Sequence, residues 1–327
     1  MSQRRVLITG ATGGLGQALV REAMARGHQV RASGRSAADL PCEFVACDLA
    51  DGQADLYALA EHCDAVVHAA ALSASWGPHA QFERANVHAT RRLLDAAGAA
   101  GCQHFVFVSS PSIFASMAHR LAIGEHDAPA DPPLNHYART KLAAERLVLA
   151  PRRDGMACTA IRPRALVGPG DRVILPRLAA MARRPRLPLP GGGRAMVELT
   201  DLRDAAWAIM EAEARAPALA GKAINVSGGQ PLEVRALATQ LAARLGQSPR
   251  LVSVPLPLAR LLAAAMEGTA RLTSRADEPA LTRYTLATLA YSQTFDLEPA
   301  RRLLGYAPRH DALASLLAEA DKLEATR

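Results

Sequence analysis

VLITGATGGLG, which runs from Val6 to Gly16, predicts how the rest of the chain is arranged. Its first four residues are apolar or β-branched and predict a short buried strand. Glycines follow at a spacing of three, at Gly10, Gly13 and Gly16, and an Ala- and Leu-rich helix is expected next, with Gly27 after its end. In such a unit the first glycine permits a sharp turn, the second lets the backbone approach a pyrophosphate, and the third lets helix and strand pack closely. Because a helix N-terminus carries free N–H groups and the positive end of a dipole, the turn predicts a phosphate-binding site.

Composition limits the class of protein. The chain has 327 residues, 50% of them hydrophobic and only 4% aromatic, so its core is expected to consist mainly of Ala, Leu and Val. Its net charge of +7 comes from scattered arginines, with no basic run longer than two residues. We interpret this charge as a solvated surface and expect no nucleic acid as a partner.

Cysteine and histidine patterns indicate neither disulfides nor a metal site. The 5 cysteines are odd in number and lack CxxC spacing, and the 10 histidines lack an HExxH or similar spacing. No signal peptide is recognised before the first strand, so we expect a reduced, cytoplasmic setting.

Strands and helices alternate through the first half of the chain. This alternation predicts an α/β fold, a doubly wound parallel sheet of the Rossmann type with helices on both faces. Strands are expected at 6–9, 28–33, 43–46, 65–71, 104–110 and 156–161, helices at 54–62, 85–100 and 137–149, and an irregular segment at 111–133. We expect a dinucleotide-binding domain over 1–170, to which 195–227 returns.

Beyond residue 170 the pattern changes. We assign 171–194 and 228–327 to a smaller, interleaved substrate-binding part. Helices are expected at 173–184, 202–214 and 232–245, a Pro- and Gly-rich break at 185–193, and strands at 195–200 and 223–226. The apolar run 256–272 contains Arg260, Glu267 and Arg271, which makes it too interrupted for a membrane span. We expect a helix that covers an apolar pocket; a surface helix that touches lipid is the alternative.

Tyr137 and Lys141 carry the strongest chemical signal outside the glycine turn. They stand four residues apart at the start of a predicted helix, so both project from one face. Since an ammonium near a phenol favours the phenolate, we expect the pKa of Tyr137 to be lowered toward a range useful for proton transfer. Ser109 and Ser110 end the fifth strand, and ligands of open α/β sheets bind at the carboxyl ends of strands. Ser110 is therefore expected to hydrogen-bond the substrate oxygen that Tyr137 protonates.

The motifs, in this order, resemble those of the extended short-chain dehydrogenase/reductases over nearly the whole chain. They are TGATGGLG, CDL at 47–49, NV at 86–87, VSSPSIF, YARTK and IRPRALVGPGD. The resemblance implies that Tyr137 donates or accepts the proton, Ser110 orients the carbonyl, and Lys141 binds the nicotinamide ribose and tunes Tyr137. It implies that Asn86 helps to hold the site or a proton-relay water, although Ala89 stands where the family commonly has glycine.

The same resemblance assigns residues to a nicotinamide dinucleotide. Asp48 and Leu49 would lie at the adenine, Ala69 and Ala70 along the end of the fourth strand, and Pro163 near the nicotinamide. The other cofactor-binding residues are expected in the glycine turn and the catalytic helix: Gly10, Thr12, Gly13, Gly14, Leu15, Gly16, Tyr137 and Lys141.

The end of the second strand favours NADP. An acidic residue there would bond the ribose 2′-hydroxyl and repel a 2′-phosphate. This chain instead has Ser33, Gly34 and Arg35, and a guanidinium can bind phosphate through two hydrogen bonds. We therefore expect NADPH to be preferred, with NAD as the other cofactor to test.

Three further stretches resemble the 3β-hydroxysteroid dehydrogenase group, which includes 2-alkyl-3-oxoalkanoate reductases and sterol 4-carboxylate 3-dehydrogenases. They are LSASWGPHAQFERANV, MVELTDLRDAAWAIMEA and EPALTRYTLATLAYSQTFDLEPARRLLGYAP, and Trp76-Gly77 and Leu281–Tyr284 carry this narrower likeness. It implies a substrate with a 3-oxo or 3-hydroxy group on a large hydrophobic body. An apolar series at helical spacing is expected to line its pocket: Leu256, Leu258, Leu261, Leu262 and Met266.

Together these patterns predict a homodimeric, NADP-dependent oxidoreductase that interconverts a ketone and a secondary alcohol. An epimerase or dehydratase acting on a nucleotide sugar is the alternative within enzymes, but such proteins usually have an acidic residue at the end of the second strand. A non-catalytic protein that senses the cofactor is the alternative outside enzymes. Such proteins tend to lose the Tyr or the Lys, whereas Tyr137 and Lys141 are both present here.

Overall fold

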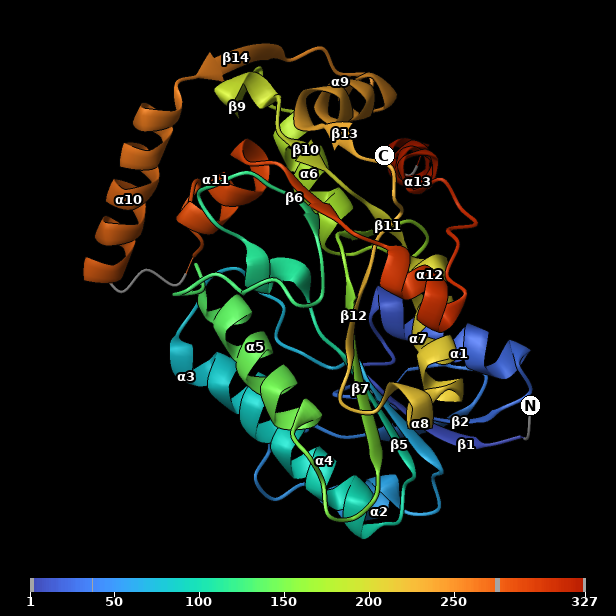
Figure 1. Cartoon of the computed structure of the whole chain (residues 1–327). Helices are drawn as coiled ribbons and strands as arrows, with labels where there is room; N and C mark the ends of the chain where they lie inside the picture. Colours follow the sequence, from blue (N-terminus) through green and yellow to red (C-terminus); the bar gives the residue numbers. More distant parts are fainter. Residues whose placement is uncertain (1–2, 37, 274–276, 326–327) are drawn as a thin grey trace.

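A seven-stranded parallel sheet forms the centre of the protein, as seen in the computed structural model, which describes residues 3–36, 38–273 and 277–325. The strand order is β12-β7-β5-β4-β1-β2-β3 (Figure 1). The strands are β1 (Arg5–Thr9), β2 (Gln29–Gly34), β3 (Glu43–Ala46), β4 (Ala65–His68), β5 (His104–Val108), β7 (Ala157–Pro163) and β12 (Ala223–Val226). This order confirms the doubly wound α/β fold. The last strand, β12, belongs to the stretch 195–227 and pairs with β7.

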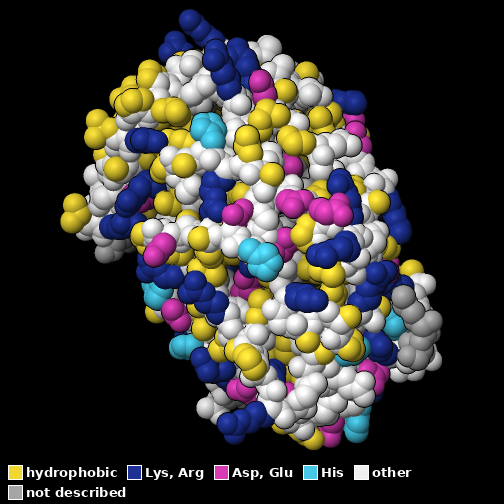
Figure 2. Space-filling model, in the orientation of Figure 1, with side chains coloured by type: hydrophobic (Ala, Val, Ile, Leu, Met, Phe, Trp, Pro, Cys, Tyr) yellow, Lys and Arg dark blue, Asp and Glu magenta, His cyan; other side chains and the backbone are white. Residues whose placement is uncertain are grey.

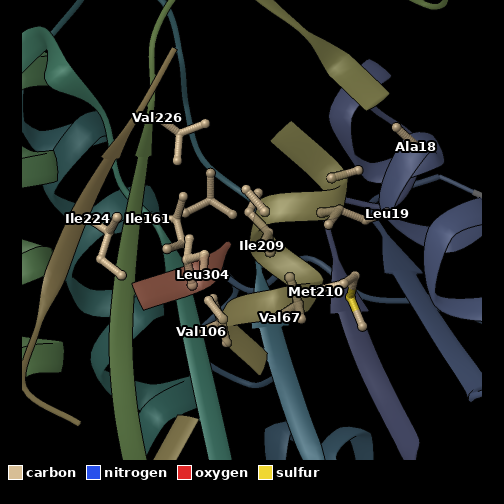
Figure 3. Close-up of a cluster of buried hydrophobic side chains, with 14 of the residues drawn as sticks. Ala18, Leu19, Val67, Val106, Ile161, Ile209, Met210, Ile224, Val226 and Leu304 are labelled. Atoms are coloured by element: carbon tan, nitrogen blue, oxygen red, sulfur yellow. The ribbon is translucent and has the colours of Figure 1, made fainter. Parts of the chain in front are cut away.

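Helices cover both faces of the sheet, because alternate side chains of each buried strand point to opposite faces. Val6 and Ile8 of β1 belong to one apolar cluster, and Leu7 belongs to the other. The first cluster includes residues of α1 (Gly14–Ala25), α7 (Leu202–Ala214) and α12 (Glu298–Leu304), and Figure 3 shows part of it. The second includes residues of α2 (Leu56–Ala60), α4 (Ala89–Ala99) and α5 (His136–Leu149).

The elements beyond this core are short strands and helices. In the first half they are α3 (His79–Phe82), the π-helical turn η1 (Glu83–His88), the 3-10 helix η2 (Pro111–Phe114) and β6 (Arg120–Ile123). In the second half they are β8 (Leu166–Val167), α6 (Ile174–Ala182), β9 (Arg186–Pro190), η3 (Gly191–Gly193), β10 (Met196–Val197), β11 (Thr200–Asp201), α8 (Ala216–Leu219), β13 (Leu232–Glu233), α9 (Val234–Arg244), β14 (Arg250–Val254), α10 (Leu256–Leu272), α11 (Arg283–Ala290), β15 (Gln293–Phe295) and α13 (Ala312–Ala325).

Three segments pair in ways that the sequence does not predict. The segment 111–133 is not wholly irregular, because it contains η2 and β6, and β6 pairs with β15. The break expected at 185–193 contains β9, which pairs in parallel with β14. The single strand expected at 195–200 is instead β10 and the start of β11, and neither joins the central sheet. In each case the partner lies far away in the sequence, so the local pattern does not reveal the pairing.

Helix α10 has the predicted bounds, but three of the five apolar residues expected to line a pocket face outward. Leu258, Leu261 and Leu262 are 48%, 67% and 44% exposed, so the expectation of a pocket lined by the whole series is wrong. The other two, Leu256 and Met266, are half-buried. Its buried face is narrow and consists of small residues and one carboxylate: Ala259, Ala263, Glu267 and Ala270. Figure 2 shows hydrophobic side chains at the surface in the upper left, where Figure 1 places α10. Among the described residues, no helix has the length and apolar character needed to cross a membrane.

The glycine turn depends on direct backbone packing. Gly10 has a φ of +70°, which favours glycine, and a Cβ there would lie 2.7 Å from the Ala70 nitrogen. A Cβ on Gly16 would lie 2.1 Å from the Gly10 oxygen, and one on Gly14 would lie 2.5 Å from the Gly170 oxygen. Strand β1, helix α1 and the segment after β8 therefore meet without intervening side chains.

We expect Gly16→Ala to destabilise the fold, by about 2 kcal/mol or more, because the added methyl cannot fit without moving the turn. Gly268→Ala is the matched control: it lies inside α10 with nothing within 4 Å of an added Cβ. Because Ala has the higher helix propensity, this control should unfold at the same or a higher urea concentration. Urea unfolding followed by circular dichroism measures both, and equal midpoints for Gly16→Ala and the parent would contradict the packing described.

Candidate functional site

The N-terminus of α1 has the geometry of an anion site. Its N-cap, Gly13, is extended and makes no side-chain capping bond, so no side chain occupies the first amides of the helix. A Cβ on Gly13 would approach only the Gly10 oxygen, at 3.4 Å, and the residue faces no other atom within 4 Å. The turn formed by Gly10, Thr12, Gly13, Gly14, Leu15 and Gly16 thus fits a bound pyrophosphate.

Ala69 and Ala70 lie against this turn. The expected strand over 65–71 ends earlier, at His68, and the Ala70 N–H donates to Thr9 Oγ1 at 3.3 Å. His68 is fully buried between Thr9 Oγ1, at 2.7 Å from Nδ1, and Thr90 Oγ1, at 2.9 Å from Nε2. Burial lowers the pKa of His68 to about 3, so this imidazole is neutral and joins β1, β4 and α4 through hydrogen bonds.

Arg35, Asp48 and Leu49 follow the carboxyl ends of β2 and β3. The Cys47 N–H donates to the Gly34 oxygen at 2.9 Å, which joins these two strand ends. Leu49 is buried, whereas Asp48 is exposed and its Oδ1 accepts from the Ala50 N–H at 3.0 Å. Arg35 is exposed and has no ion pair with any residue that the structure describes. Its guanidinium is therefore free to bind an anion.

Ser110 lies beside Tyr137 at the carboxyl end of β5. Its hydroxyl accepts from the Ser112 N–H at 3.2 Å at the start of η2, and it acts to lower the pKa of the Tyr137 phenol. Tyr137 lies in the first turn of α5, which begins where Asn135 Oδ1 accepts the Ala138 N–H at 2.8 Å. Ser109 is buried, and its hydroxyl has no partner among the described residues. The fold thus brings Ser110, and not Ser109, to the phenol.

Burial controls the protonation of Tyr137 and Lys141. It raises the pKa of Tyr137 to about 12, and the hydrogen bond with Ser110 opposes this only in part. The predicted lowering of this pKa is wrong, because the Lys141 ammonium donates to the Val108 oxygen and lies 4.0 Å from the centre of the Phe107 ring. Burial lowers the pKa of Lys141 to about 7, and the nearby carboxylate of Glu145 raises it in part.

Asn86 connects the segment after β4 to helix α5. It lies in the π-helical turn η1, where the sequence predicts a continuous α-helix over 85–100. Its Oδ1 accepts the Leu72 N–H at 2.7 Å, and its Nδ2 donates to the Leu72 oxygen at 3.2 Å and to Thr140 Oγ1 at 3.1 Å. Thr140 precedes Lys141 and was not foreseen as part of the site. Asn86 therefore fixes the backbone position of α5.

Two residues that are linked electrostatically to the candidate site were missed from the sequence. Tyr284, in the first turn of α11, influences the pKa of both Tyr137 and Arg164. The start of α11 is held by buried Glu267 of α10, whose Oε1 accepts the Arg283 N–H at 2.6 Å. Arg164 directly follows Pro163, the buried last residue of β7. The sequence contained a signal for Tyr284, because Leu281–Tyr284 resembles the 3β-hydroxysteroid dehydrogenase group. Arg164 had no such signal: only its burial and its lack of a charged partner among the described residues distinguish it from other arginines.

The family of the chain follows from this fold and from its sequence. Residues 6–227 match the NAD dependent epimerase/dehydratase family, so the chain belongs to that family. It is an NAD(P)-dependent enzyme, a short-chain dehydrogenase/reductase of the extended type.

Two curated proteins and one solved structure illustrate what the chain is similar to. The 2-alkyl-3-oxoalkanoate reductase of Stenotrophomonas maltophilia is 38% identical over 315 residues, which cover 93% of this chain and 95% of that protein. The 3 beta-hydroxysteroid dehydrogenase/Delta 5-->4-isomerase of Mycobacterium tuberculosis is 31% identical over 327 residues, covering 93% of this chain and 86% of that one. Among solved structures, MoeE5 in complex with UDP-glucose and NAD has a TM-score of 0.77 and 26% identity, with 98% of this chain and 99% of that chain covered.

We expect Lys141→Met to stabilise the cofactor-free protein most at pH 7 and below. The folded pKa of Lys141, about 7, lies below its usual value of 10.5, so a buried charge is disfavoured at low pH. Between these two pH values the unfolded chain binds a proton that the folded chain lacks, so the parent gains stability as pH rises. The advantage of the variant should therefore shrink from pH 7 to pH 10.5.

Urea unfolding of parent and variant across this pH range measures the effect. Lys222→Met, which removes an exposed ammonium, is the control and should show no such trend. A stabilisation by Lys141→Met that grows with pH would contradict the burial of the charge.

Proposed function

We propose that this enzyme is an NADP-dependent oxidoreductase that interconverts a ketone and a secondary alcohol on a hydrophobic 3-oxo or 3-hydroxy substrate. One observation carries the proposal: Ser110 follows the carboxyl end of β5 and acts on the pKa of Tyr137, and buried Lys141 lies one helical turn further along α5. Two hydroxyls that converge there can bind one carbonyl oxygen. The name of the Stenotrophomonas relative, a reductase of 2-alkyl-3-oxoalkanoates, supports the substrate class.

Proton transfer is the part assigned to this chain's own residues. The nicotinamide, when bound, supplies or accepts the hydride. Because burial raises the pKa of Tyr137, its phenol is protonated at neutral pH and suits donation to the oxygen of a ketone under reduction. Ser110 orients that oxygen. Lys141 is proposed to bind the cofactor ribose, and Asn86 to keep α5 in place.

A nucleotide-sugar epimerase or dehydratase is the second candidate, since MoeE5 is similar in structure and was solved with UDP-glucose and NAD. The end of β2 favours the reductase instead: Gly34 and Arg35 stand there without a carboxylate that would bond an adenosine ribose. The homodimer, the cytoplasmic setting and the domain limits stay predictions from the sequence.

The substrate class is tested with a series of straight-chain 3-hydroxy acids and NADP, followed by the absorbance of NADPH. We expect kcat/KM to rise with chain length, by up to about 4-fold per buried CH₂. Tyr137→Phe should lower kcat by about 10²-fold or more and leave the Kd for NADPH nearly unchanged. Efficient conversion of UDP-glucose, with no response to the hydrophobic series, would establish the second candidate instead.

Cofactor preference is tested at Arg35. Because its exposed guanidinium has no ion-pair partner in the part of the chain that the structure describes, we propose that it binds the 2′-phosphate of NADP. Arg35→Ala should raise KM for NADPH by about 10-fold and change KM for NADH little. Arg21→Ala, which removes an exposed arginine from α1, is the control. A parent enzyme that uses NADPH and NADH equally well would refute this role.

A further inference from the structure

Arg164 is a buried arginine whose charge has no partner. Only 7% of the residue is exposed, and its Nε has no hydrogen bond. The guanidinium makes neither a hydrogen bond nor an ion pair with any residue over 3–36, 38–273 and 277–325. The guanidinium carbon lies 6.0 Å from the centre of the Phe295 ring. A buried cation without a partner costs free energy, so such a residue calls for an explanation beyond packing.

Arg162 shows that this strand can satisfy a buried arginine. It is 6% exposed, its Nε donates to Glu145 Oε2 at 2.8 Å, and its Nη2 pairs with the same carboxylate. Arg164 lies two residues further on, yet has no such carboxylate. Glu198 acts on the charge of Arg164, but its carboxylate already has a partner: Oε2 accepts the Ser227 hydroxyl at 2.6 Å.

The backbone holds Arg164 in a fixed place. Its N–H donates to the Val226 oxygen at 2.9 Å, and the Thr200 hydroxyl donates to its oxygen. The next residue, Ala165, has a φ of +40°, and its oxygen accepts the Thr200 N–H at 3.0 Å. A non-glycine residue in this region is strained, and such strain clusters at binding sites.

Arg164 also lies at the end of the sheet where the candidate site is expected. It follows the carboxyl end of β7, at the edge of the sheet where ligands of this fold bind. The Tyr284 phenol acts electrostatically on both Arg164 and Tyr137. Tyr284 thus links Arg164 electrostatically to the residue that we propose as the proton donor.

We propose that Arg164 binds the carboxylate of the substrate, so that the enzyme acts on 3-oxo or 3-hydroxy acids in preference to neutral ketones and alcohols. This inference rests on the proposed function. A guanidinium fork matches a carboxylate with two parallel hydrogen bonds, and one buried positive charge balances one carboxylate rather than a doubly charged phosphate. In such an acid only one carbon separates the carboxylate from the reacting carbon, so the proposal requires the Arg164 guanidinium and the Tyr137 phenol to reach the same end of the substrate.

The kinetic test compares 3-hydroxydodecanoate with its methyl ester, using NADP and the absorbance of NADPH. Hydroxy acids are chosen because 3-oxo acids lose carbon dioxide in solution. In the parent enzyme kcat/KM for the acid should exceed that for the ester by about 10-fold or more. Arg164→Gln should lower kcat/KM for the acid by about 10²-fold, mainly through KM, and change that for the ester by less than about 3-fold. Arg139→Gln, which removes an exposed arginine from the catalytic helix, is the control and should alter neither.

Thermal unfolding provides a readout that does not depend on turnover. Because the charge of Arg164 is buried and unpaired, Arg164→Met should raise the Tm of the ligand-free protein. Dodecanoate, added with NADPH, should raise the Tm of the parent and of Arg139→Gln, but not that of Arg164→Gln. A lower Tm for Arg164→Met would assign the arginine to the fold and overturn the inference.

The kinetic outcomes separate this inference from the function on which it rests. If the parent oxidises the ester as well as the acid, or if Arg164→Gln weakens both equally, the carboxylate site is wrong and the proposed function stands. If the parent oxidises neither compound, the proposed function is wrong. The shift in Tm with dodecanoate then decides the carboxylate site by itself.

Discussion

The contact between the Gly16 Cα and the Gly10 oxygen is the constraint on which the arrangement of the site depends. With only 2.1 Å available to a Cβ at Gly16, helix α1 is held directly against the end of β1. The same turn meets Ala70 after β4 and Gly170 after β8 through backbone atoms alone. Because no side chain intervenes, there is little freedom for these strand ends to shift. The phosphate turn and the catalytic edge of the sheet are thus set by one rigid corner.

Burial acts on two titratable groups of the candidate site without an ion pair to offset it. Buried Glu213, by contrast, pairs with Arg4 at 2.7 Å. At the site, burial shifts the pKa of Tyr137 and of Lys141 toward their neutral forms, and no carboxylate pairs with Lys141 within ion-pair distance among the described residues. A ligand that brings hydrogen bonds or an opposite charge stabilises such buried, shifted side chains more than it would stabilise exposed ones. Titratable groups with shifted pKa values therefore cluster at active sites.

Helices and strands could be predicted from the sequence where they depend on neighbouring residues. Contacts between segments that are distant in the sequence could not. The strands of the central sheet were predicted because each is a short buried run between turn residues, and α10 was predicted to the residue. The pairings of β6 with β15 and of β9 with β14 were missed, since their partners are remote in sequence. The face of α10 was also misjudged: alanines such as Ala259 and Ala263 pack inward and leave the leucines outside. Hydrophobicity alone does not tell which side of a helix has a neighbour.

Arg162 and Arg164, two positions apart at the end of β7, differ in what they contribute: one stabilises the fold, and the other is proposed to bind the substrate. Arg162 binds Glu145 of α5, the helix that also carries Tyr137 and Lys141, so its ion pair ties the catalytic helix to the sheet. Breaking that buried pair would leave Glu145 uncompensated and cost stability. Arg164 makes no such ion pair with any described residue, and burying its unpaired charge opposes folding. A residue that weakens the fold, in a backbone fixed by Thr200 and Val226, is explained most simply by what it binds.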